Sequence, residues 1–229
     1  MIRIDGELVV EKRLSSRDLR EPEARAALAA EAALLGALGG RVTPRLVGSG
    51  EDAGGPFLRT AAVPWPTLAE RLEKAADATF VEAAVRATFL ALAGLHEAED
   101  ADGPLDVVHA DLSPANVAVA PDGSTATILD LGLALARGSA PRDGAFRGTP
   151  LYVAPEVARG ERPSVQADLF SLAATLLHVA TGEAPRGGGS LAVLVARAGD
   201  EPVLDPRRAA LAARGPGHAA MIACLAHDP

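Results

Sequence analysis

Two short apolar runs in the middle of the chain predict a β-hairpin. Residues 117–120 and 125–129 are mostly apolar or β-branched, and the turn-forming sequence Pro-Asp-Gly-Ser separates them. If residue 120 pairs with residue 125, residue 116 lies opposite residue 129, because antiparallel partners step in opposite directions. The hairpin therefore brings Asn116 and Asp130 to the same end of a two-stranded ribbon. Asp111 lies just upstream, on a Pro-containing loop that leads into the first strand.

The pattern before this ribbon predicts a small sheet with one helix. Asp5-Gly6 is a strong hairpin signal between two strands, and Gly39 closes a stretch rich in Ala and Leu that reads as a helix. The polar, Gly-rich stretch 48–55 is interpreted as a hairpin connection, because it does not match G-x-G-x-x-G and follows the helix. We expect strands at residues 2–4, 8–13, 42–47 and 57–62 and a helix at residues 23–38.

Helical signals dominate the rest of the chain. Thr67 with Glu70 and Thr79 with Glu82 have the spacing of capping boxes, which start helices. A long apolar stretch ends at Gly182, a typical helix terminator. We expect helices to begin at residues 67 and 79 and to span residues 164–181, 190–197 and 217–227.

Composition narrows the classes of protein. The chain has 229 residues and a formal net charge of −8, so it can bury a large core and shows no basic footprint for nucleic acid. Cys224 is the single cysteine, which suits a reducing compartment. No apolar run approaches the ~20 residues of a membrane span, and no signal-peptide core stands at the N-terminus. We therefore expect a soluble, cytoplasmic protein with no membrane segment and no nucleic-acid partner.

The oxygen atoms of Asp111, Asn116 and Asp130 suggest a cation site. Two carboxylates and an amide would converge on one small volume at the end of the predicted ribbon. A hard cation such as Mg²⁺ takes one or two carboxylates and completes its shell with water and phosphate oxygens. The sequence therefore predicts Mg²⁺ chemistry at this place.

Four segments, in order along the chain, resemble the motifs of protein kinases. His109-Ala110-Asp111 with Asn116 resembles the catalytic loop, and Asp130-Leu131-Gly132 resembles the metal-binding triplet. The stretch Gly-Thr-Pro-Leu-Tyr-Val-Ala-Pro-Glu at 148–156 is similar to the end of an activation segment. Asp-Leu-Phe-Ser-Leu at 168–172 is similar to the start of the buried central helix. The chain thus resembles a eukaryotic-like, bacterial-type Ser/Thr protein kinase domain from about residue 8 to its end.

This resemblance implies an α+β fold with two lobes. It places a small β-rich N-lobe with one helix at residues 1–60, a hinge at residues 61–66, and a larger, mainly helical C-lobe at residues 67–229. It also implies that ATP, bound with Mg²⁺, is the phosphoryl donor and that the acceptor is a Ser or Thr hydroxyl of a protein substrate.

The resemblance also implies a role for each site residue. Asp111 would accept or orient the proton of the substrate hydroxyl as it attacks the γ-phosphoryl group. Asn116 and Asp130 would hold Mg²⁺, and Lys12, positioned by Glu31, would hold the nucleotide phosphates. The implied catalytic residues are Asp111, Ser113 and Thr149, the implied nucleotide-binding residues are Lys12, Glu31, Thr60 and Ala62, and the implied metal ligands are Asn116 and Asp130.

Three departures from the family pattern concern the phosphates. No Gly-rich loop precedes Ile2, so the resemblance implies an N-terminally incomplete domain or weak ATP binding. Ala110 replaces the arginine of His-Arg-Asp, which argues against switching through phosphorylation of the activation loop. Ser113 replaces a lysine that touches the transferred phosphate, so slow chemistry is expected unless an arginine such as Arg147 supplies the charge.

Two further departures lie elsewhere. Glu156 pairs in the family with an arginine shortly after an Asp-Pro, and the sequence stops at Asp228-Pro229, which suggests truncation within this motif. The acidic loop at residues 97–104 is longer than the resemblance leads one to expect, and the sequence assigns it no function.

The sequence allows two alternative roles for each of two residues. Lys12 is either the phosphate-binding strand lysine or an edge-strand lysine that favours solubility. Asp168 either complements the dipole of its own helix or binds the catalytic-loop backbone as a buried acid.

Three functions stay open at this point. The first is an active Ser/Thr protein kinase, which the retained acids and Lys12 favour. The second is a pseudokinase that serves as a binding or scaffold module, which the missing Gly-rich loop favours. The third is an atypical or small-molecule phosphotransferase, because His-Ala-Asp-Leu-Ser is also similar to RIO-type kinases. That last family lacks the segment at 148–156.

Overall fold

Four short strands near the N-terminus form one antiparallel sheet in the order β1-β2-β4-β3. The computed structural model describes residues 1–72, 76–139, 147–200 and 208–225. Asp5 and Gly6 connect β1 to β2 with positive φ angles of 49° and 85°, the backbone that a two-residue hairpin turn requires. The strands are β1 (Ile2–Ile4), β2 (Glu7–Arg13), β3 (Leu46–Asp52) and β4 (Gly55–Ala61).

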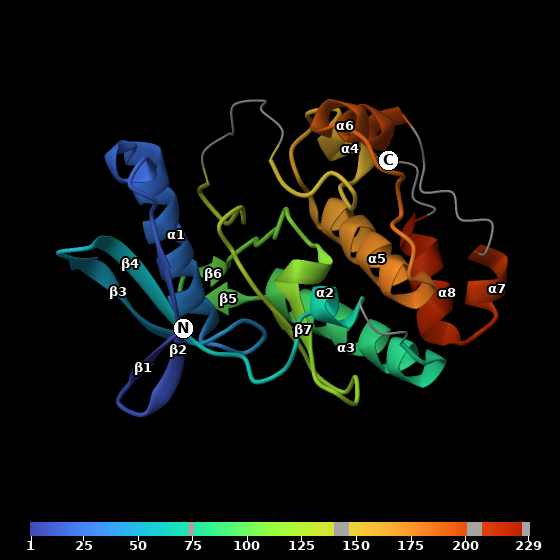
Figure 1. Ribbon diagram of the computed structural model, residues 1–229, viewed down its shortest axis with the longest axis horizontal. Helices are drawn as coiled ribbons and strands as arrows, with labels where there is room; N and C mark the ends of the chain where they lie inside the picture. Colours follow the sequence, from blue (N-terminus) through green and yellow to red (C-terminus); the bar gives the residue numbers. More distant parts are fainter. Residues whose placement is uncertain (73–75, 140–146, 201–207, 226–229) are drawn as a thin grey trace.

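One helix, α1 (Pro22–Leu38), packs against β3 and β4 of this sheet (Figure 1). Proline occupies its first turn, and Gly39 ends it in the left-handed conformation with φ 62°. Its buried face contains Leu28, Ala32 and Leu35, and also the charged residue Glu31. The helix therefore carries a carboxylate into the interior beside the sheet.

The sequence prediction for residues 42–62 is wrong in its boundaries. We expected a Gly-rich loop at residues 48–55, but β3 runs through Gly48 and Gly50 as far as Asp52, and β4 begins at Gly55. Leu46 pairs with Thr60, and the register continues to the pair of Asp52 with Gly55. Backbone pairing with β4 holds this polar edge strand together, although its side chains are those of a loop.

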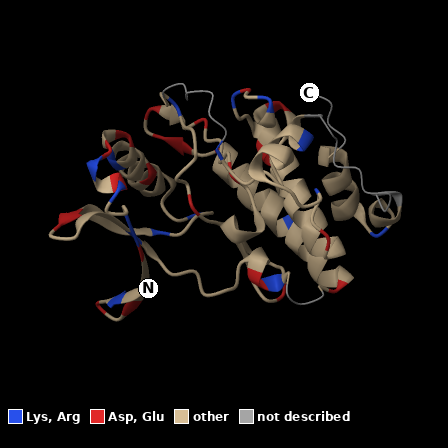
Figure 2. Cartoon of the chain, turned by 45° about the horizontal axis from the view of Figure 1, so that its top comes forward, with Lys and Arg blue, Asp and Glu red and all other residues tan. Residues whose placement is uncertain are grey.

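The remainder of the chain is mainly helical. The long helices α3 (Ala78–His96) and α5 (Val165–Thr181) pack against each other and against α8 (Pro216–Leu225), and their contacts form most of the core. Figure 2 shows that charged residues gather on the sheet and α1, while the long helices are mostly uncharged. The other elements are η1 (Asp18–Arg20), α2 (Leu68–Arg71), β5 (Glu99–Asp100), β6 (Gly103–Pro104), η2 (Pro114–Asn116), β7 (Val117–Val119), β8 (Ala126–Ile128), α4 (Pro155–Ala158), α6 (Leu191–Asp200) and α7 (Arg208–Ala212).

One of the two predicted capping boxes is present. Thr67 caps α2 and exchanges both hydrogen bonds with Glu70, as expected. The second prediction is wrong, because Asp77 caps α3 by accepting from the Phe80 amide. Glu82 instead reaches the first turn of α8, where it accepts from the Gly217 amide at 2.8 Å and from Nδ1 of His218 at 2.6 Å.

Helix α3 is an exception to the prediction that no apolar segment approaches the length of a membrane span. With 19 residues and a mean hydropathy of 1.5, it is long and apolar enough to cross a membrane by length and composition. Its Ala-rich sequence carries only Glu82 and Arg86 as charges. Half of this window is buried within the protein, against α5, α8 and β8. Such burial is what a core helix of a folded domain shows.

Candidate active site

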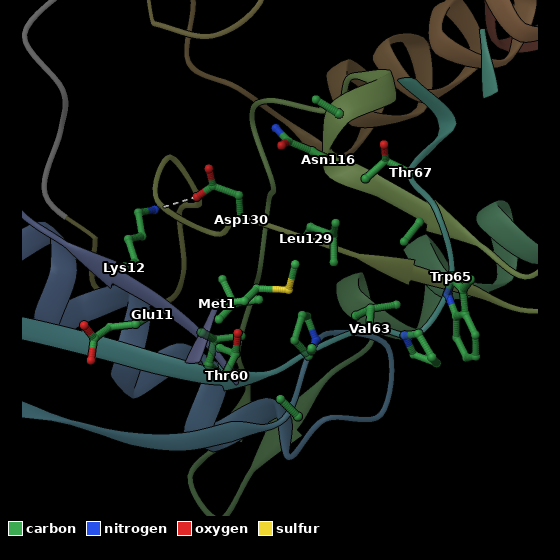
Figure 3. A pocket seen from close by; sticks show the side chains of 18 of the residues that line it. Met1, Glu11, Lys12, Thr60, Val63, Trp65, Thr67, Asn116, Leu129 and Asp130 are labelled. Atoms are coloured by element: carbon green, nitrogen blue, oxygen red, sulfur yellow. Dashed lines mark hydrogen bonds and ion pairs between the residues drawn. The ribbon is translucent and has the colours of Figure 1, made fainter. Parts of the chain in front are cut away.

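The β7–β8 ribbon has the predicted register. Val117 pairs with Ile128 and Val119 with Ala126, and the Leu129 amide donates to the carbonyl of Asn116 at 2.8 Å. Residue 116 therefore lies opposite residue 129, as the hairpin argument required. Asn116 and Asp130 both line one cavity at this end of the ribbon, and Figure 3 shows them there.

Asp111 lies in contact with two of the predicted site residues. Nδ2 of Asn116 donates to the Asp111 carbonyl at 2.8 Å and to Oδ2 of its carboxylate at 3.2 Å. The hydroxyl of Thr149 donates to Oδ1 of Asp111 at 2.8 Å. Residues 38 positions apart in the sequence thus meet at one carboxylate.

Lys12 joins the sheet, α1 and the ribbon. Its ammonium donates to Oε2 of Glu31 at 2.9 Å and to Oδ1 of Asp130 at 2.7 Å. Figure 3 shows the Lys12 side chain extending from the sheet toward Asp130 at one side of the cavity. The predicted ion pair between Lys12 and Glu31 is present. The solubility interpretation of Lys12 is not supported, because two carboxylates from other elements hold its ammonium.

Burial and pairing oppose each other in this cluster. Burial raises the pKa of Glu31 even though the hydrogen bond from Lys12 acts to lower it. Burial acts to lower the pKa of Lys12, but the hydrogen bonds to Asp130 and Glu31 outweigh it, so the pKa is raised. Burial acts to raise the pKa of Asp130, but the hydrogen bond from Lys12 outweighs it and leaves the pKa lowered. Lys12 and Asp130 therefore stay charged at neutral pH.

Gly132 leaves the space in which this cluster forms. A Cβ atom at residue 132 would lie 2.9 Å from Nζ of Lys12 and 3.1 Å from Oδ1 of Asp130. The Gly132 amide also donates to that Oδ1 at 3.1 Å. A side chain at this position would displace the ammonium.

We predict that Gly132→Ala lowers nucleotide affinity by about tenfold, because the displaced Lys12 loses a charge-assisted hydrogen bond. Isothermal titration with ATP measures this effect. Gly188→Ala is the matched control, since a Cβ atom there meets nothing within 4 Å and, like Gly132, this glycine does not have a positive φ. Equal affinities of the two variants would contradict the prediction.

A cavity of about 820 Å³ opens beside the cluster. Thr60, Ala62 and Val63 line it together with Lys12 and Asp130. The Ala62 amide is already engaged, because it donates to the Leu8 carbonyl at 2.9 Å. The Val63 amide has no hydrogen-bond partner among the described residues. Ala62 therefore lines the cavity without a free amide, and its suggested binding role stays a prediction.

Ser113 does not join this group. It is only 4% exposed, and its carbonyl accepts from the Asn116 amide at 2.9 Å. Arg147, the suggested replacement for the missing charge, lines a separate cavity beside Glu23 of α1. Among the described residues, the side-chain hydrogen bonds to the Asp111 carboxylate come from Asn116 and Thr149, so the suggested roles of Ser113 and Arg147 stay predictions.

Asp168 of α5 holds the loop that carries Asp111. It is 1% exposed and accepts from the His109 amide at 2.7 Å and the Ala110 amide at 2.9 Å. Ala110 has a φ of 66°, a strained conformation for alanine that needs such support. Of the two interpretations of Asp168, the structure supports the buried acid.

His109 packs the loop from inside. It is fully buried, Nε2 donates to the Leu129 carbonyl at 2.9 Å, and Nδ1 accepts from the Asp111 amide at 3.2 Å. His96, which no sequence motif marks, also contacts this acid from the end of α3, where its Nε2 lies 2.9 Å from Oδ2 of Asp168. No local pattern could reveal this contact, because the two residues are 72 positions apart.

A model of the protein kinase domain matches residues 3–198 of this chain. The chain belongs to the protein kinase family. The described sheet with α1 and the helical remainder agree with the predicted α+β kinase fold.

Bacterial protein kinases are among the similar proteins. The serine/threonine-protein kinase AfsK of Streptomyces griseus is 36% identical over 67% of this chain and 19% of its own length. The probable serine/threonine-protein kinase PkwA of Thermomonospora curvata is 29% identical over 86% of this chain and 26% of its own length. The tyrosine-protein kinase MasK of Myxococcus xanthus is 38% identical over 38% of this chain and 14% of its own length. The chain thus spans a small part of each relative.

The kinase domain also contains the acidic loop that the sequence left unexplained. Residues 99–104 form the short hairpin β5–β6. Arg137, which follows the Asp130 triplet, donates to both carboxylate oxygens of Asp100 at 2.9 and 2.8 Å and to the Pro104 carbonyl at 2.7 Å. The hairpin therefore binds the start of the activation segment. Glu156 is buried, and the predicted Asp228-Pro229 motif lies outside the described residues.

Proposed function

We propose that this domain transfers the γ-phosphoryl group of ATP to Ser and Thr hydroxyls of protein substrates. The observation that carries the proposal is the contact of a threonine hydroxyl with the Asp111 carboxylate at 2.8 Å. It demonstrates that a hydroxyl reaches this carboxylate at hydrogen-bonding distance, which a general base requires. Asp111 would orient the acceptor hydroxyl and take its proton as the oxygen attacks phosphorus.

The cavity supports nucleotide binding. Its volume of about 820 Å³ suits a ligand of nucleotide size. The Val63 amide would donate to the base, and Thr60 would bound the inner end of the pocket. Lys12, held by Glu31, would contact the phosphates, so the positive charge is positioned before the nucleotide arrives.

The residues at the end of the ribbon fit a Mg²⁺ ion. Asn116 uses its amide nitrogen toward Asp111, and Asp130 uses Oδ1 toward Lys12. Oδ1 of Asn116 and Oδ2 of Asp130 have no protein partner among the described residues. One amide and one carboxylate oxygen suit Mg²⁺, which keeps water and phosphate oxygens in its remaining positions. When bound, the ion would neutralise phosphate charge, while Asn116 and Asp130 hold it and Lys12 orients the phosphates.

Thr149 supports a preference for Ser and Thr over Tyr. Gly148 has a φ of 116°, and a Cβ atom there would lie 3.4 Å from Oδ1 of Asp111. The Gly148-Thr149 turn therefore lies close to the carboxylate. The acceptor side chain then has only a short distance to span between the substrate backbone and Asp111. A tyrosine hydroxyl would have to approach from farther away.

The proposed division into lobes follows the same geometry. Strand β4 ends at Ala61 and α2 begins at Leu68, so the linking segment comprises residues 62–67. We propose that residues 1–60 and 67–229 act as the N-lobe and the C-lobe, with the hinge at 61–66. A cytoplasmic location is likewise proposed, on the ground that Cys224 is the single cysteine.

Thermal melting with ATP tests the nucleotide and metal sites together. ATP with Mg²⁺ at a hundredfold excess over its Kd should stabilise the chain by about 2.7 kcal/mol, and Asp130→Asn should remove the part that depends on Mg²⁺. Asp122→Asn in the turn of the same ribbon is the control, since within the described part of the chain its carboxylate bonds only to Ser124 of that turn. If ATP stabilises the wild-type chain equally with and without Mg²⁺, the assigned metal site is wrong.

Transfer of labelled phosphate to peptides tests the reaction. Three peptides that differ only in carrying Ser, Thr or Tyr at one position serve as acceptors. The Ser and Thr peptides should receive much more labelled phosphate than the Tyr peptide. Magnesium-dependent ATP binding without labelling of any peptide would identify a pseudokinase instead. Labelling of the Tyr peptide alone would contradict the assigned role of Thr149.

A further inference from the structure

Arg186 is a buried cation outside the site described above. It is 6% exposed and follows α5 in the sequence Pro-Arg-Gly-Gly-Gly. Its Nη1 lies within hydrogen-bonding distance of the Val153 carbonyl at 2.9 Å, the Leu151 carbonyl at 3.1 Å and the Pro150 carbonyl at 3.3 Å. One guanidinium thus binds three backbone carbonyls of the segment that directly follows Thr149.

The contacts of Arg186 offset the cost of burying its positive charge. Removing a guanidinium from water is costly, and the cost is offset only where acceptors are well placed. Here the converging carbonyl dipoles supply the acceptors, and the guanidinium lies over the ring of Phe170 at 5.6 Å from its centroid. In turn, the converging carbonyls need a positive group between them, because their dipoles repel one another.

The same segment is held on its other side by the catalytic loop. The Thr149 hydroxyl donates to Asp111, and the Tyr152 amide donates to the Thr149 carbonyl at 3.0 Å. The Tyr152 hydroxyl lies 2.8 Å from Nδ1 of His178 on α5. Residues 149–153 therefore connect the Asp111 carboxylate to Arg186 through a short stretch of backbone with little freedom to move.

We propose that Arg186 is a positioning residue for the protein substrate. By holding the carbonyls of residues 150–153, it sets the distance of this segment from Asp111, and so the place where an acceptor peptide docks. This inference rests on the proposed function, because it concerns the substrate side of the same site. Arg186 touches neither the Lys12 cluster nor the nucleotide cavity among the described residues, so it acts on the peptide and not on ATP.

Steady-state kinetics with Arg186→Met tests the proposal, since Met keeps an unbranched apolar stem and removes the guanidinium and its charge. We expect KM for an acceptor peptide to rise about tenfold, which corresponds to the loss of one hydrogen bond from a charged group. KM for ATP should stay within about twofold, because the nucleotide cavity is untouched. Arg186→Lys should recover part of the peptide KM, because an ammonium supplies the charge without the planar fork.

Arg159→Met is the matched control. Arg159 also donates to a backbone carbonyl, that of Gly199 at 2.9 Å, and in the described structure its side chain makes no hydrogen bond to residues 150–153. It should leave both KM values unchanged. An unchanged peptide KM in Arg186→Met, or an equal rise of both KM values, would overturn the proposal, because either result describes a merely structural residue. If the Met variant does not fold, the Lys variant decides by the same criterion.

Hydrogen exchange separates this proposal from the proposed function. Arg186→Lys should speed exchange of the Tyr152 amide by about tenfold relative to Arg159→Met, whether or not the chain turns over substrate. A wild-type chain that labels no peptide would refute the phosphoryl-transfer function, and the exchange rates would still decide whether Arg186 holds this segment. Equal exchange in the two variants would overturn the role of Arg186 alone.

Discussion

Asp111→Ala should lower kcat for peptide phosphorylation by about 10³-fold, since general bases contribute about 10²–10⁴-fold and this one also orients the acceptor. The carboxylate accepts from both Thr149 and Asn116, and these two hydrogen bonds hold its orientation toward the acceptor hydroxyl. Affinity for ATP with Mg²⁺ should change by no more than about threefold, because Lys12 and Asp130 keep their contacts. Single-turnover transfer and isothermal titration measure the two quantities separately.

The pH dependence of kcat supplies a second test of Asp111. Burial raises the pKa of Asp111 above its ordinary value of 3.8, and the hydrogen bond from Thr149 partly offsets this. The base must be ionised to accept a proton, so kcat falls as the pH is lowered through the raised pKa. Thr149→Val removes a bond that lowers the pKa, and should therefore move the acidic limb of the profile to higher pH.

Asp122→Ala is the control for the loss of a carboxylate near the ribbon, and it should leave kcat unchanged. Asp122 is exposed in the turn between β7 and β8, where it bonds Ser124. If Asp111→Ala retains more than about a tenth of wild-type kcat, a base at Asp111 is ruled out. If Asp111→Ala also abolishes ATP binding, the substitution disrupts the whole catalytic loop, and Asp111 then has a structural role.

Asp168→Ala should lower the free energy of unfolding by about 3 kcal/mol, the usual result of removing one partner from a buried polar network. The amides of His109 and Ala110 and Nε2 of His96 would lose their common acceptor in the interior. Ala110 would also lose the bond that holds its strained backbone. Urea unfolding gives the change in stability, and kcat should fall as well because the loop carries Asp111.

Ser171→Ala provides the control for Asp168. Ser171 lies three residues farther along α5 and is 9% exposed, and its hydroxyl has no hydrogen-bond partner among the described residues. Its replacement should change stability by about 0.5 kcal/mol or less. Equal stabilities of the two variants would show that the Asp168 carboxylate does not hold the catalytic loop.

The β7–β8 ribbon shows how far local reasoning reaches. Its turn and register follow from a few neighbouring residues, because a short turn leaves only one pairing that buries both apolar runs. Helix α1 and its glycine terminator follow from local signals in the same way. The edge strand β3 does not, since its polar sequence is that of a loop and only the partner strand β4 holds it extended.

The sequence by itself determined the chemical groups, their order and the hairpin that brings Asn116 and Asp130 to one end. It also pointed to Glu31 as the partner of Lys12. Only the tertiary structure decided that Ser113 is buried, that the Ala62 amide is engaged, and that Arg186 collects three carbonyls. The physical reason is range: turns and helix ends depend on bonds between neighbours, whereas burial and the partners of a charge depend on residues far away in the chain.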